Sequence, residues 1–366
     1  MDKRKQFVAA DHAGISGRKM ECLFGQDRVI RKNGVFGTLL RVAVTLAIAM
    51  LLGCGSSDTS SDTPPMLGAP PSDWMKAISD QTPISRLSIP GTHDSGTYTQ
   101  DQTSGGGYVK TQMWSFYDQL SVLGIRFLDI RCRLIGDGFA IHHERVFLGL
   151  SFQDVIDQCR SFLLTHPNET ILMDVGHEWQ DEEGSSLSFH QVFLNYYNAN
   201  KYLDEAHTRE LWYLGTTIPT LGQVRGKIVL MRNFDLDPGA AAIGIAMPPG
   251  QNTAFYSYQF STNPDETVYV ENLWTPDAPI FTDAFDIKWR AIQDNIGLAQ
   301  KDSSPNHLYM TFTSATMFPW HTPLEFAQHI NWQLKVFPAG SGPMGIVVMD
   351  YPGDEAYSII NTNAGD

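Results

Sequence analysis

Two adjacent residues with acid–base side chains, His93 and Asp94, follow an apolar segment that ends in Pro90-Gly91. The apolar segment predicts a β-strand, and the Pro-Gly pair predicts its end. In a barrel of parallel strands, the residues just beyond the C-terminal ends of the strands form the active site. His93 and Asp94 are therefore candidate catalytic residues, and the alternative for an isolated His-Asp pair is an ordinary turn.

Charged residues alternate with apolar ones along a second predicted strand, which places Asp129, Arg131 and Arg133 on one face. Three charges that face into a barrel need partners or a ligand. A guanidinium group donates hydrogen bonds in a planar fork that matches a phosphate group. Arg131 is therefore a candidate phosphate-binding residue, with a structural salt bridge to Asp129 as the alternative.

A third predicted strand ends in two further histidines, His142 and His143. Histidines from different strands can meet over one substrate. Because histidine titrates near neutral pH, one imidazole can act as a base while the other, held protonated by a carboxylate, acts as an acid. Asp350 follows the last predicted strand, where its carboxylate could hold one imidazole in the correct tautomer.

The elements that must position these residues are short β-rich segments separated by helical or irregular stretches. A helix is predicted over 151–165, and a proline ends it. Strands that alternate with helices predict parallel βαβ units, and eight of them predict an α/β fold, a single irregular (β/α)8 TIM-type barrel over 73–366. Between Pro238 and Pro264 the chain is rich in Gly, Ala and Pro, so we expect an irregular barrel there. The predicted strands are 86–89, 127–131, 139–142, 170–175, 227–231, 268–273, 307–313 and 345–349.

The N-terminal segment has the layout of a bacterial signal peptide. Basic residues precede an apolar run over 35–52, and the run leads to Cys54 in a string that resembles a lipobox. We therefore expect a signal peptide over 1–53, a lipidated Cys54 and a flexible tether over 54–72, rich in Ser, Asp, Thr, Pro and Gly. The alternative, an uncleaved membrane anchor, is disfavoured because Arg41 interrupts the apolar run. The expected location is extracytoplasmic, on a bacterial membrane or released from it.

Composition and charge exclude several classes of protein. With 42% apolar and 18% charged residues, the chain has the composition of a globular protein. The chain has 26 Lys/Arg and 40 Asp/Glu. Residues 1–53 contain nine of the basic and four of the acidic residues, so the rest of the chain has a formal net charge of −19. A domain so acidic should not bind nucleic acid and would be repelled by an anionic bilayer. Docking on a membrane must therefore be apolar or covalent.

Two cysteines, Cys132 and Cys159, remain in the predicted domain. In an oxidising compartment they could form a disulfide. The alternative is two buried free thiols, because both residues have apolar neighbours.

These strings together resemble the bacterial phosphatidylinositol-specific phospholipases C, from Trp74 to about Asn361. The resemblance implies an irregular α/β barrel and a reaction in which the inositol 2-hydroxyl attacks phosphorus, diacylglycerol leaves and a cyclic inositol phosphate forms. It also implies a base, an acid, their carboxylate partners and a phosphate-binding guanidinium. By this resemblance, His93 is the base and Asp350 its carboxylate partner, while His143 is the acid and Asp94 its partner. Arg131 binds the phosphate, and Asp129 supports the site.

The resemblance also bears on metals and cofactors, of which we expect none. Eukaryotic relatives bind calcium, but here Arg131 fills the strand position that a calcium ligand would need, and its charge would repel the ion. The alternative is an oxygen-rich calcium site at Asp94, Asp129 and Asp350.

The chain departs from the family pattern in the predicted headgroup pocket. Family members place a lysine where this chain has Gly176, which His177 and Glu178 follow. They place an arginine where it has Asn233, and an aspartate and a tyrosine where it has Asn272 and Trp274. The catalytic chemistry is therefore better supported than the identity of the sugar, and a phosphodiesterase for another phospholipid or glycolipid headgroup is the first alternative. A surface binding protein without turnover is the second. We expect headgroup contacts from His177, Arg232, Asn233, Asn272 and Trp274, and the alternative is that they line the rim without a ligand.

Large apolar side chains crowd a predicted loop at the mouth of the active site. Phe318 and Trp320 lie in this loop, and Tyr108 lies on an earlier loop at the same rim. Aromatic rings favour the membrane interface, and in the resembled family a tryptophan at the position of Trp320 inserts into the bilayer. We therefore expect a monomer that meets a phospholipid membrane through these residues, although they could instead fold back into the core.

Overall fold

The computed structural model describes residues 69–178, 184–260, 263–278, 283–337 and 342–365. All of them belong to one compact unit. The predicted signal peptide, the lipidated Cys54 and most of the predicted tether lie outside the described residues. The first described element is a 3-10 helix over Pro71–Ala77. Among the described helices, none is both long and apolar enough to cross a bilayer.

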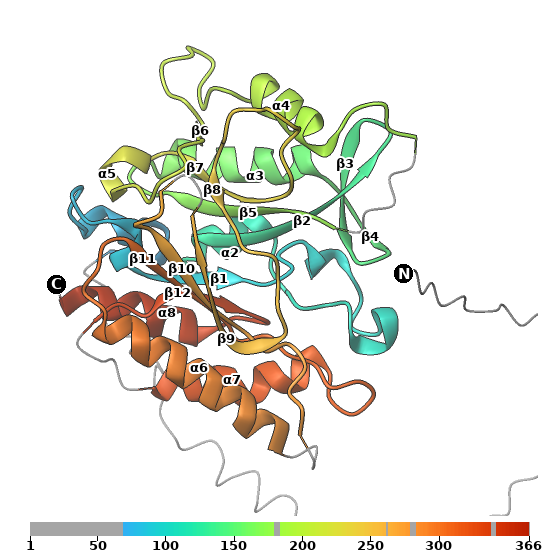
Figure 1. Cartoon of the computed structure of the whole chain (residues 1–366), viewed down its shortest axis with the longest axis vertical. Helices are drawn as coiled ribbons and strands as arrows, with labels where there is room; N and C mark the ends of the chain where they lie inside the picture. The colour runs from blue at the N-terminus through green and yellow to red at the C-terminus, as the bar shows by residue number, and fades with distance from the viewer. Residues whose placement is uncertain (1–68, 179–183, 261–262, 279–282, 338–341, 366) are drawn as a thin grey trace, which may run out of the picture. The chain divides into compact units, whose positions relative to one another are not determined.

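A mostly parallel sheet forms the centre of the domain, in the order β6-β7-β5-β2-β1-β12-β11-β10-β9 (Figure 1). The pairs β9–β10, β2–β3 and β3–β4 are antiparallel, and β8 pairs in parallel with β7. The strands are β1 (Ser88–Thr92), β2 (Phe127–Ile135), β3 (Gly138–His143), β4 (Val146–Ser151), β5 (Ile171–His177), β6 (Trp212–Tyr213), β7 (Ile228–Asn233), β8 (Ile245–Ala246), β9 (Thr253–Gln259), β10 (Thr267–Asn272), β11 (His307–Phe312) and β12 (Gly345–Met349).

Helices cover the outer face of this sheet. In Figure 1, α3 and α4 lie over the β5 and β7 side, whereas α6, α7 and α8 lie along the side of β11 and β12. Their bounds are α2 (Phe116–Ser121), α3 (Phe152–Thr165), α4 (Phe189–Ala199), α5 (Leu221–Val224), α6 (Asp283–Lys301), α7 (Pro323–Val336) and α8 (Asp354–Asn361). The predicted helix over 151–165 is confirmed as α3, and Ser151 and Asp154 form a capping box at its start.

The alternation of side chains divides the core into two clusters. On β5, Leu172 packs in the inner cluster with Phe127 and Val229, whereas Met173 and Val175 pack in the outer cluster with the residues of α3. This period of two is the pattern expected of a strand that is buried on both faces. It also decides which polar residues near the strand ends face the interior.

Each of the eight predicted strands has a counterpart, although β1 continues through Pro90 and Gly91, which were predicted to end it. The expected closed ring is not present among the described strands. Among the described residues, no strand pairing joins β8 to β9, so the hydrogen-bonded sheet is open there. The opening lies in the segment 238–264, where irregularity was expected and where prolines remove the backbone donors that a ladder needs. A second correction concerns β3, which forms a hairpin with β2 and β4 outside the main strand order.

The two cysteines of the domain are free and buried in the outer cluster. Burial raises the pKa of both thiols, so they remain protonated and inert. The alternative of two buried thiols is therefore the correct one for Cys132 and Cys159.

Candidate active site

His93 lies directly after β1, and the pairing of β1 with β12 places it beside Asp350. The backbone N–H of His93 donates to the carbonyl of Met349 at 3.0 Å, which continues the ladder past the strand end. The Nδ1 atom of His93 lies 2.8 Å from Oδ1 of Asp350. Gln112 anchors the same turn, because its Nε2 donates to the carbonyls of His93 at 2.7 Å and Met349 at 2.9 Å. The imidazole is therefore held by its δ nitrogen, and its Nε2 faces the site.

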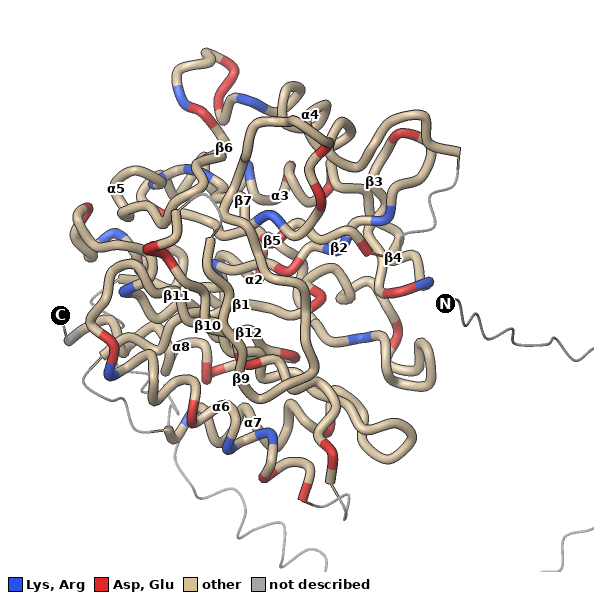
Figure 2. The backbone as a smooth tube through the Cα atoms, in the orientation of Figure 1, with Lys and Arg blue, Asp and Glu red and all other residues tan. Residues whose placement is uncertain are grey.

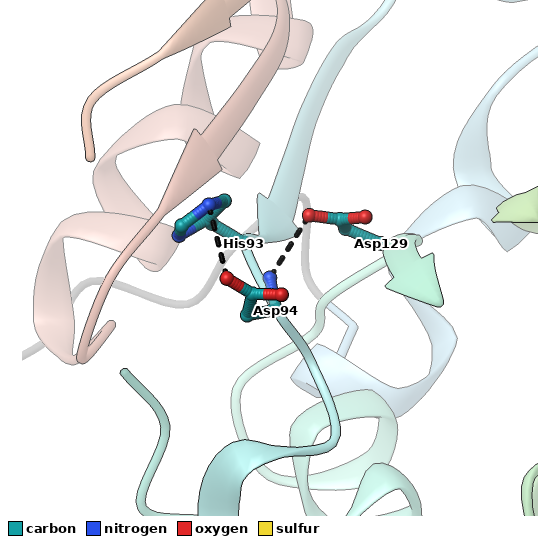
Figure 3. Close-up of side chains that lie close together, drawn as sticks. All are labelled: His93, Asp94 and Asp129. Carbon is teal, nitrogen blue, oxygen red and sulfur yellow. Dashed lines mark hydrogen bonds and ion pairs between the residues drawn. The ribbon is translucent and has the colours of Figure 1, made fainter. Parts of the chain in front are cut away.

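Asp94 connects the candidate catalytic groups. Its Oδ2 lies 3.2 Å from Nε2 of His93 and 3.2 Å from Nε2 of His143, and its Oδ1 lies 3.0 Å from Nε of Arg131. The backbone N–H of Asp94 donates to Oδ2 of Asp129 at 3.0 Å (Figure 3). Asp94 has a φ of 45°, a left-handed conformation that aspartate tolerates better than most residues. One buried carboxylate therefore contacts both imidazoles and the guanidinium.

Arg131 contacts two carboxylates, those of Asp94 and Asp129. Its Nη2 lies 3.0 Å from Oδ2 of Asp129, and its Nε contacts both oxygens of Asp129 at 3.2 and 3.3 Å. The salt bridge to Asp129 is thus present, and Arg131 also lines the cavity. Figure 2 shows acidic and basic positions side by side where β2 and β5 lie.

Charge interactions raise the pKa of both site histidines. Burial by itself would lower the pKa of His93 and His143, but the Asp94 carboxylate outweighs burial for His143, and Asp94 with Asp350 outweighs it for His93. Burial also opposes ionisation of Asp94, yet Arg131 and the two histidines hold its pKa well below the usual range. The neighbouring carboxylates Asp129 and Asp94 overcome burial and raise the pKa of Arg131. The site therefore holds Asp94 ionised and favours protonated imidazoles.

These residues line a cavity of about 700 Å³ at the C-terminal ends of the strands. The cavity brings together all five predicted catalytic residues and Asp129. It also includes four of the five predicted headgroup residues and two of the three predicted membrane residues. Its lining contains His93, Asp94, Asp129, Arg131, His143, Asp350, His177, Asn233, Asn272, Trp274, Tyr108 and Phe318.

Arg232 lies outside this lining. Its guanidinium donates to the carbonyls of Ile243 at 3.0 Å and of Phe234, so it is engaged by the backbone beyond β7. Asn233, the next residue, lines the cavity, and adjacent residues of a strand point to opposite faces. The alternation therefore explains why only one of the two faces the headgroup pocket.

His142 and His143 separate in the same way. His143 contacts Asp94, whereas His142 is buried on the other face of β3, with its ring 5.5 Å from that of Phe147. Burial lowers the pKa of His142, which keeps it neutral. Only the second histidine of the pair belongs to the site.

The sequence interpretation missed Asp174 and Tyr256, which also line the cavity. Asp174 lies on a predicted strand in phase with Gly176, so its inward position could have been read from the period of two. Tyr256 lies on β9, which was not predicted because its residues are mostly half-exposed or exposed and its neighbours are rich in Gly and Pro. Glu178, at the same wall, accepts a hydrogen bond from the backbone of Glu144 at 2.6 Å.

His93, Asp94 and Asp129 are close enough to offer ligand atoms to one metal ion. The guanidinium of Arg131, however, contacts both carboxylates of this set at 3.0 Å. A divalent cation bound there would have to displace or repel that charge, so the three residues fit a guanidinium better than a metal ion.

The rim of the cavity exposes aromatic side chains. Phe318 is 76% exposed and Trp320 is 58% exposed, and the ring of Tyr108 lies 5.3 Å from that of Phe318. The alternative that Phe318 and Trp320 fold back into the core is wrong. Phe318 and Tyr108 line the cavity, and Trp320 follows on the same loop, two residues after Phe318. We call these three residues the aromatic rim.

Comparison with known proteins places these observations in a family. Residues 82–234 match the family described as "Phosphatidylinositol-specific phospholipase C, X domain". The chain is 30% identical to the 1-phosphatidylinositol phosphodiesterase of Listeria monocytogenes over 290 residues, covering 76% of this chain and 80% of that protein. It is 27% identical to the protein of the same name from Staphylococcus aureus over 320 residues, covering 85% of this chain and 92% of that protein.

Solved structures of the same kind of enzyme share the fold. The phosphatidylinositol-specific phospholipase C of S. aureus superposes with a TM-score of 0.67 at 25% identity, over 80% of this chain and 97% of that chain. The corresponding structure from L. monocytogenes gives a TM-score of 0.61 at 27% identity, over 81% and 99%. The predicted irregular TIM-type barrel is therefore confirmed, with the open strand order described above.

Proposed function

We propose that this protein, which belongs to the phosphatidylinositol-specific phospholipase C X-domain family, cleaves phosphatidylinositol to diacylglycerol and a cyclic inositol phosphate. Its membership in this family makes it an enzyme that acts on phosphoric diesters. The observation that carries the finer proposal is the Asp94 carboxylate, which contacts His93, His143 and Arg131 together. This arrangement supplies a base, an acid and a phosphate-binding cation around one point.

His93 is the base of this mechanism. Asp350 holds its Nδ1 at 2.8 Å and so fixes the tautomer in which Nε2 can take a proton. Nε2 removes the proton of the inositol 2-hydroxyl as that oxygen attacks phosphorus. Because the nucleophile belongs to the substrate, bringing it in line with the phosphate supplies much of the rate.

His143 is the acid. Its Nε2 lies 3.2 Å from Asp94, whose negative charge keeps the imidazole protonated before the reaction. As the bond between phosphorus and the glycerol oxygen breaks, His143 gives its proton to that oxygen and diacylglycerol leaves neutral. The two Nε2 atoms thus act on opposite sides of the phosphorus atom, one on the attacking oxygen and one on the leaving oxygen.

Arg131 stabilises the charge that develops on the phosphate. Its contacts with Asp94 and Asp129 use Nε and Nη2, which fixes the plane of the guanidinium and leaves Nη1 to donate to a phosphate oxygen. In this mechanism the guanidinium takes the part that a metal ion plays in other phosphodiesterases, so the proposal includes no metal and no other cofactor.

The proposal extends to where the enzyme works. We propose a monomer, lipidated at Cys54 and tethered outside the cytoplasm of a bacterium, that meets a phospholipid bilayer with Phe318, Trp320 and Tyr108. The exposure of Phe318, which lines the cavity, and of Trp320 two residues further along supports this orientation. The formal negative charge of the chain, −14, argues against nucleic acid as a partner.

Phosphorus NMR of the products tests the proposed function. Purified protein is mixed with phosphatidylinositol in mixed micelles, and in parallel with phosphatidylcholine, phosphatidylethanolamine and phosphatidylglycerol. A five-membered cyclic phosphodiester signal, formed only from phosphatidylinositol, is the expected result. Turnover of another headgroup in its place would favour the alternative phosphodiesterase, and no turnover of any lipid would favour a binding protein.

A further inference from the structure

The wall of the cavity contains a buried carboxyl group, that of Asp174, with few hydrogen-bond partners. Asp174 lies on β5, where the strand register pairs it with Asp129 on one side and Met231 on the other. The layer beneath it consists of Leu172 and its strand partners Phe127 and Val229, which are apolar and fully buried. The sheet thus places a second carboxyl beside Asp129, directly above the hydrophobic core.

The two neighbouring carboxyls differ in what compensates them. Asp129 receives the guanidinium of Arg131 and the backbone N–H of Asp94. Asp174 is 4% exposed, and among the described residues its one hydrogen-bond donor is the amide of Asn233, at 3.3 Å from Oδ2. Its Oδ1 has no hydrogen-bond partner in the described part of the chain, although the residue lines the cavity. A buried oxygen without a partner destabilises a fold, and a ligand in the cavity can supply the missing hydrogen bond.

The protonation of the Asp174 carboxyl suits a ligand that carries a hydroxyl group. Burial, and then the negative charge of Asp129, raise the pKa of Asp174 well above the usual range for a carboxyl, which favours the neutral form. A neutral carboxyl can donate one hydrogen bond and accept others. A hydroxyl group has the same two capacities and can therefore pair with it in either direction.

Three further residues of the cavity wall share this uncharged character, unlike the ion pair of Asp129 and Arg131. Asn233, Asn272 and Tyr256 line the same cavity and are uncharged, since burial raises the pKa of Tyr256 to about 12. Next to them Gly176 leaves room, because a Cβ at this position would meet its first neighbour, the Asn233 amide, at 3.7 Å. Uncharged donors and acceptors around open space match a ring that carries several hydroxyls.

We propose that Asp174 is a specificity-determining residue, which hydrogen-bonds one hydroxyl of the headgroup in a subsite completed by Asn233, Asn272 and Tyr256. The proposal rests on the proposed function, because the phosphate of the same substrate must lie on Arg131. It assigns to this chain its own way of holding a polyol ring, through a neutral carboxyl and amides.

The variant Asp174→Leu separates this role from a structural one. Leucine has a similar shape and suits the apolar layer, so the thermal midpoint should stay the same or rise. The KM for phosphatidylinositol should rise about tenfold or more, since a hydroxyl is left without its partner. Asp174→Asn keeps both a donor and an acceptor and should show a smaller rise. Met231→Leu, in the same layer, is the matched control and should leave KM unchanged.

A set of monodeoxy myo-inositols identifies the hydroxyl. Each is tested as a competitive inhibitor of the wild type and of Asp174→Leu, with free myo-inositol as the reference. One analogue should inhibit the wild type about tenfold less well than myo-inositol, yet inhibit Asp174→Leu as well as myo-inositol does. Such coupling between one hydroxyl and one side chain is a result that altered packing would not produce.

The outcomes separate the two proposals. If the wild type cleaves phosphatidylinositol but no analogue shows this coupling, or if Asp174→Leu keeps the wild-type KM, the role of Asp174 is wrong and the proposed function stands. If Asp174→Leu lowers the thermal midpoint by many degrees and Asp174→Asn keeps the wild-type KM, the carboxyl is structural. If the wild type does not cleave phosphatidylinositol, the proposed function fails, and this inference fails with it.

Discussion

The Nδ1 atom of His93 lies 2.8 Å from Oδ1 of Asp350, across the seam where β1 pairs with β12. Asp350 is buried. The imidazole that it contacts is proposed to take a proton from the substrate through its other nitrogen, Nε2. The carboxylate therefore fixes both the orientation and the tautomer of the imidazole that is the base in the proposed mechanism. In that mechanism it would also stabilise the imidazolium that forms when the proton is taken.

Asp350→Asn tests this relationship, because the amide keeps the shape of the side chain and removes its charge. We expect kcat to fall by about 10²- to 10⁴-fold with an unchanged fold, checked by turnover of phosphatidylinositol and by circular dichroism. Asp354→Asn is the control, since Asp354 pairs on the surface with Lys335 and should not affect turnover. Activity of Asp350→Asn within about threefold of the wild type would remove the carboxylate from the mechanism.

The pH dependence of kcat/KM should reflect the raised pKa of both histidines. The base must be neutral, so activity rises as pH increases through the pKa of His93, which lies above the ordinary value of 6.5. The acid must be protonated, so activity falls as pH passes the pKa of His143, also raised. Both limbs of the profile should therefore lie on the alkaline side of 6.5.

Asp94→Asn provides the matched test of this cause. Asp94 contributes to the rise for both imidazoles, so its loss should move the alkaline limb to lower pH as well as lower the maximum rate. A profile of the wild type whose rise is complete below pH 6.5, or an Asp94→Asn profile with unmoved limbs, would contradict the electrostatic role of Asp94.

Part of this site could be predicted from sequence because local rules determine it. The period of two on β2 puts Asp129 and Arg131 on one face, and both line the cavity. The same rule, applied to Arg232 and Asn233, would have excluded Arg232. The contact of His93 with Asp350 depends on the pairing of two strands 257 residues apart, and only the assembled sheet or a family resemblance provides it.

The fold shows the same division. Strands buried on both faces gave clear apolar segments, so β5, β7 and β12 were predicted close to their true bounds. β8 has two residues, and β9 is an antiparallel strand at the end of the sheet order with many exposed side chains, so neither has a buried apolar segment. The closed ring was predicted from the number of strands, and it fails where these two weak strands would have to meet.

Arg131→Lys should lower kcat strongly although it keeps the charge. An ammonium group cannot contact Asp94 and Asp129 and also present a planar fork to the phosphate. We expect a loss of about 10²-fold or more, measured on a water-soluble cyclic inositol phosphate to avoid effects of the lipid surface. Arg133→Lys, two residues along the same strand and outside the cavity lining, is the control. Full activity of Arg131→Lys would show that the positive charge is sufficient and that the planar guanidinium is not needed.

Chelation tests the metal-free mechanism. Because the guanidinium of Arg131 contacts the carboxylates that a divalent ion would need, EDTA should leave turnover of phosphatidylinositol unchanged. Turnover is measured before and after exhaustive dialysis against EDTA, and again after calcium is added. Loss of activity that calcium restores would show that the carboxylates near His93 bind a metal after all.

The aromatic rim at the mouth of the cavity should be needed on a lipid surface and dispensable in solution. Phe318 and Trp320 are 76% and 58% exposed, so their replacement removes apolar surface from the rim without opening a cavity in the core. Coulomb attraction to an anionic bilayer is not available to a chain with a formal charge of −14. Apolar and aromatic contacts must therefore provide much of the binding.

The double variant Phe318→Ser with Trp320→Ser, in a soluble form that lacks residues 1–71, measures this contribution. We expect weaker binding to phosphatidylinositol vesicles in a sedimentation assay, and about tenfold or more lower activity on them, while hydrolysis of a water-soluble cyclic inositol phosphate stays near that of the wild type. Trp332→Ser is the control, because Trp332 is 66% exposed on α7 and does not line the cavity. Equal losses on both substrates would show that Phe318 and Trp320 maintain the shape of the site. Equal loss of vesicle binding in Trp332→Ser would show that any exposed aromatic residue contributes to membrane binding.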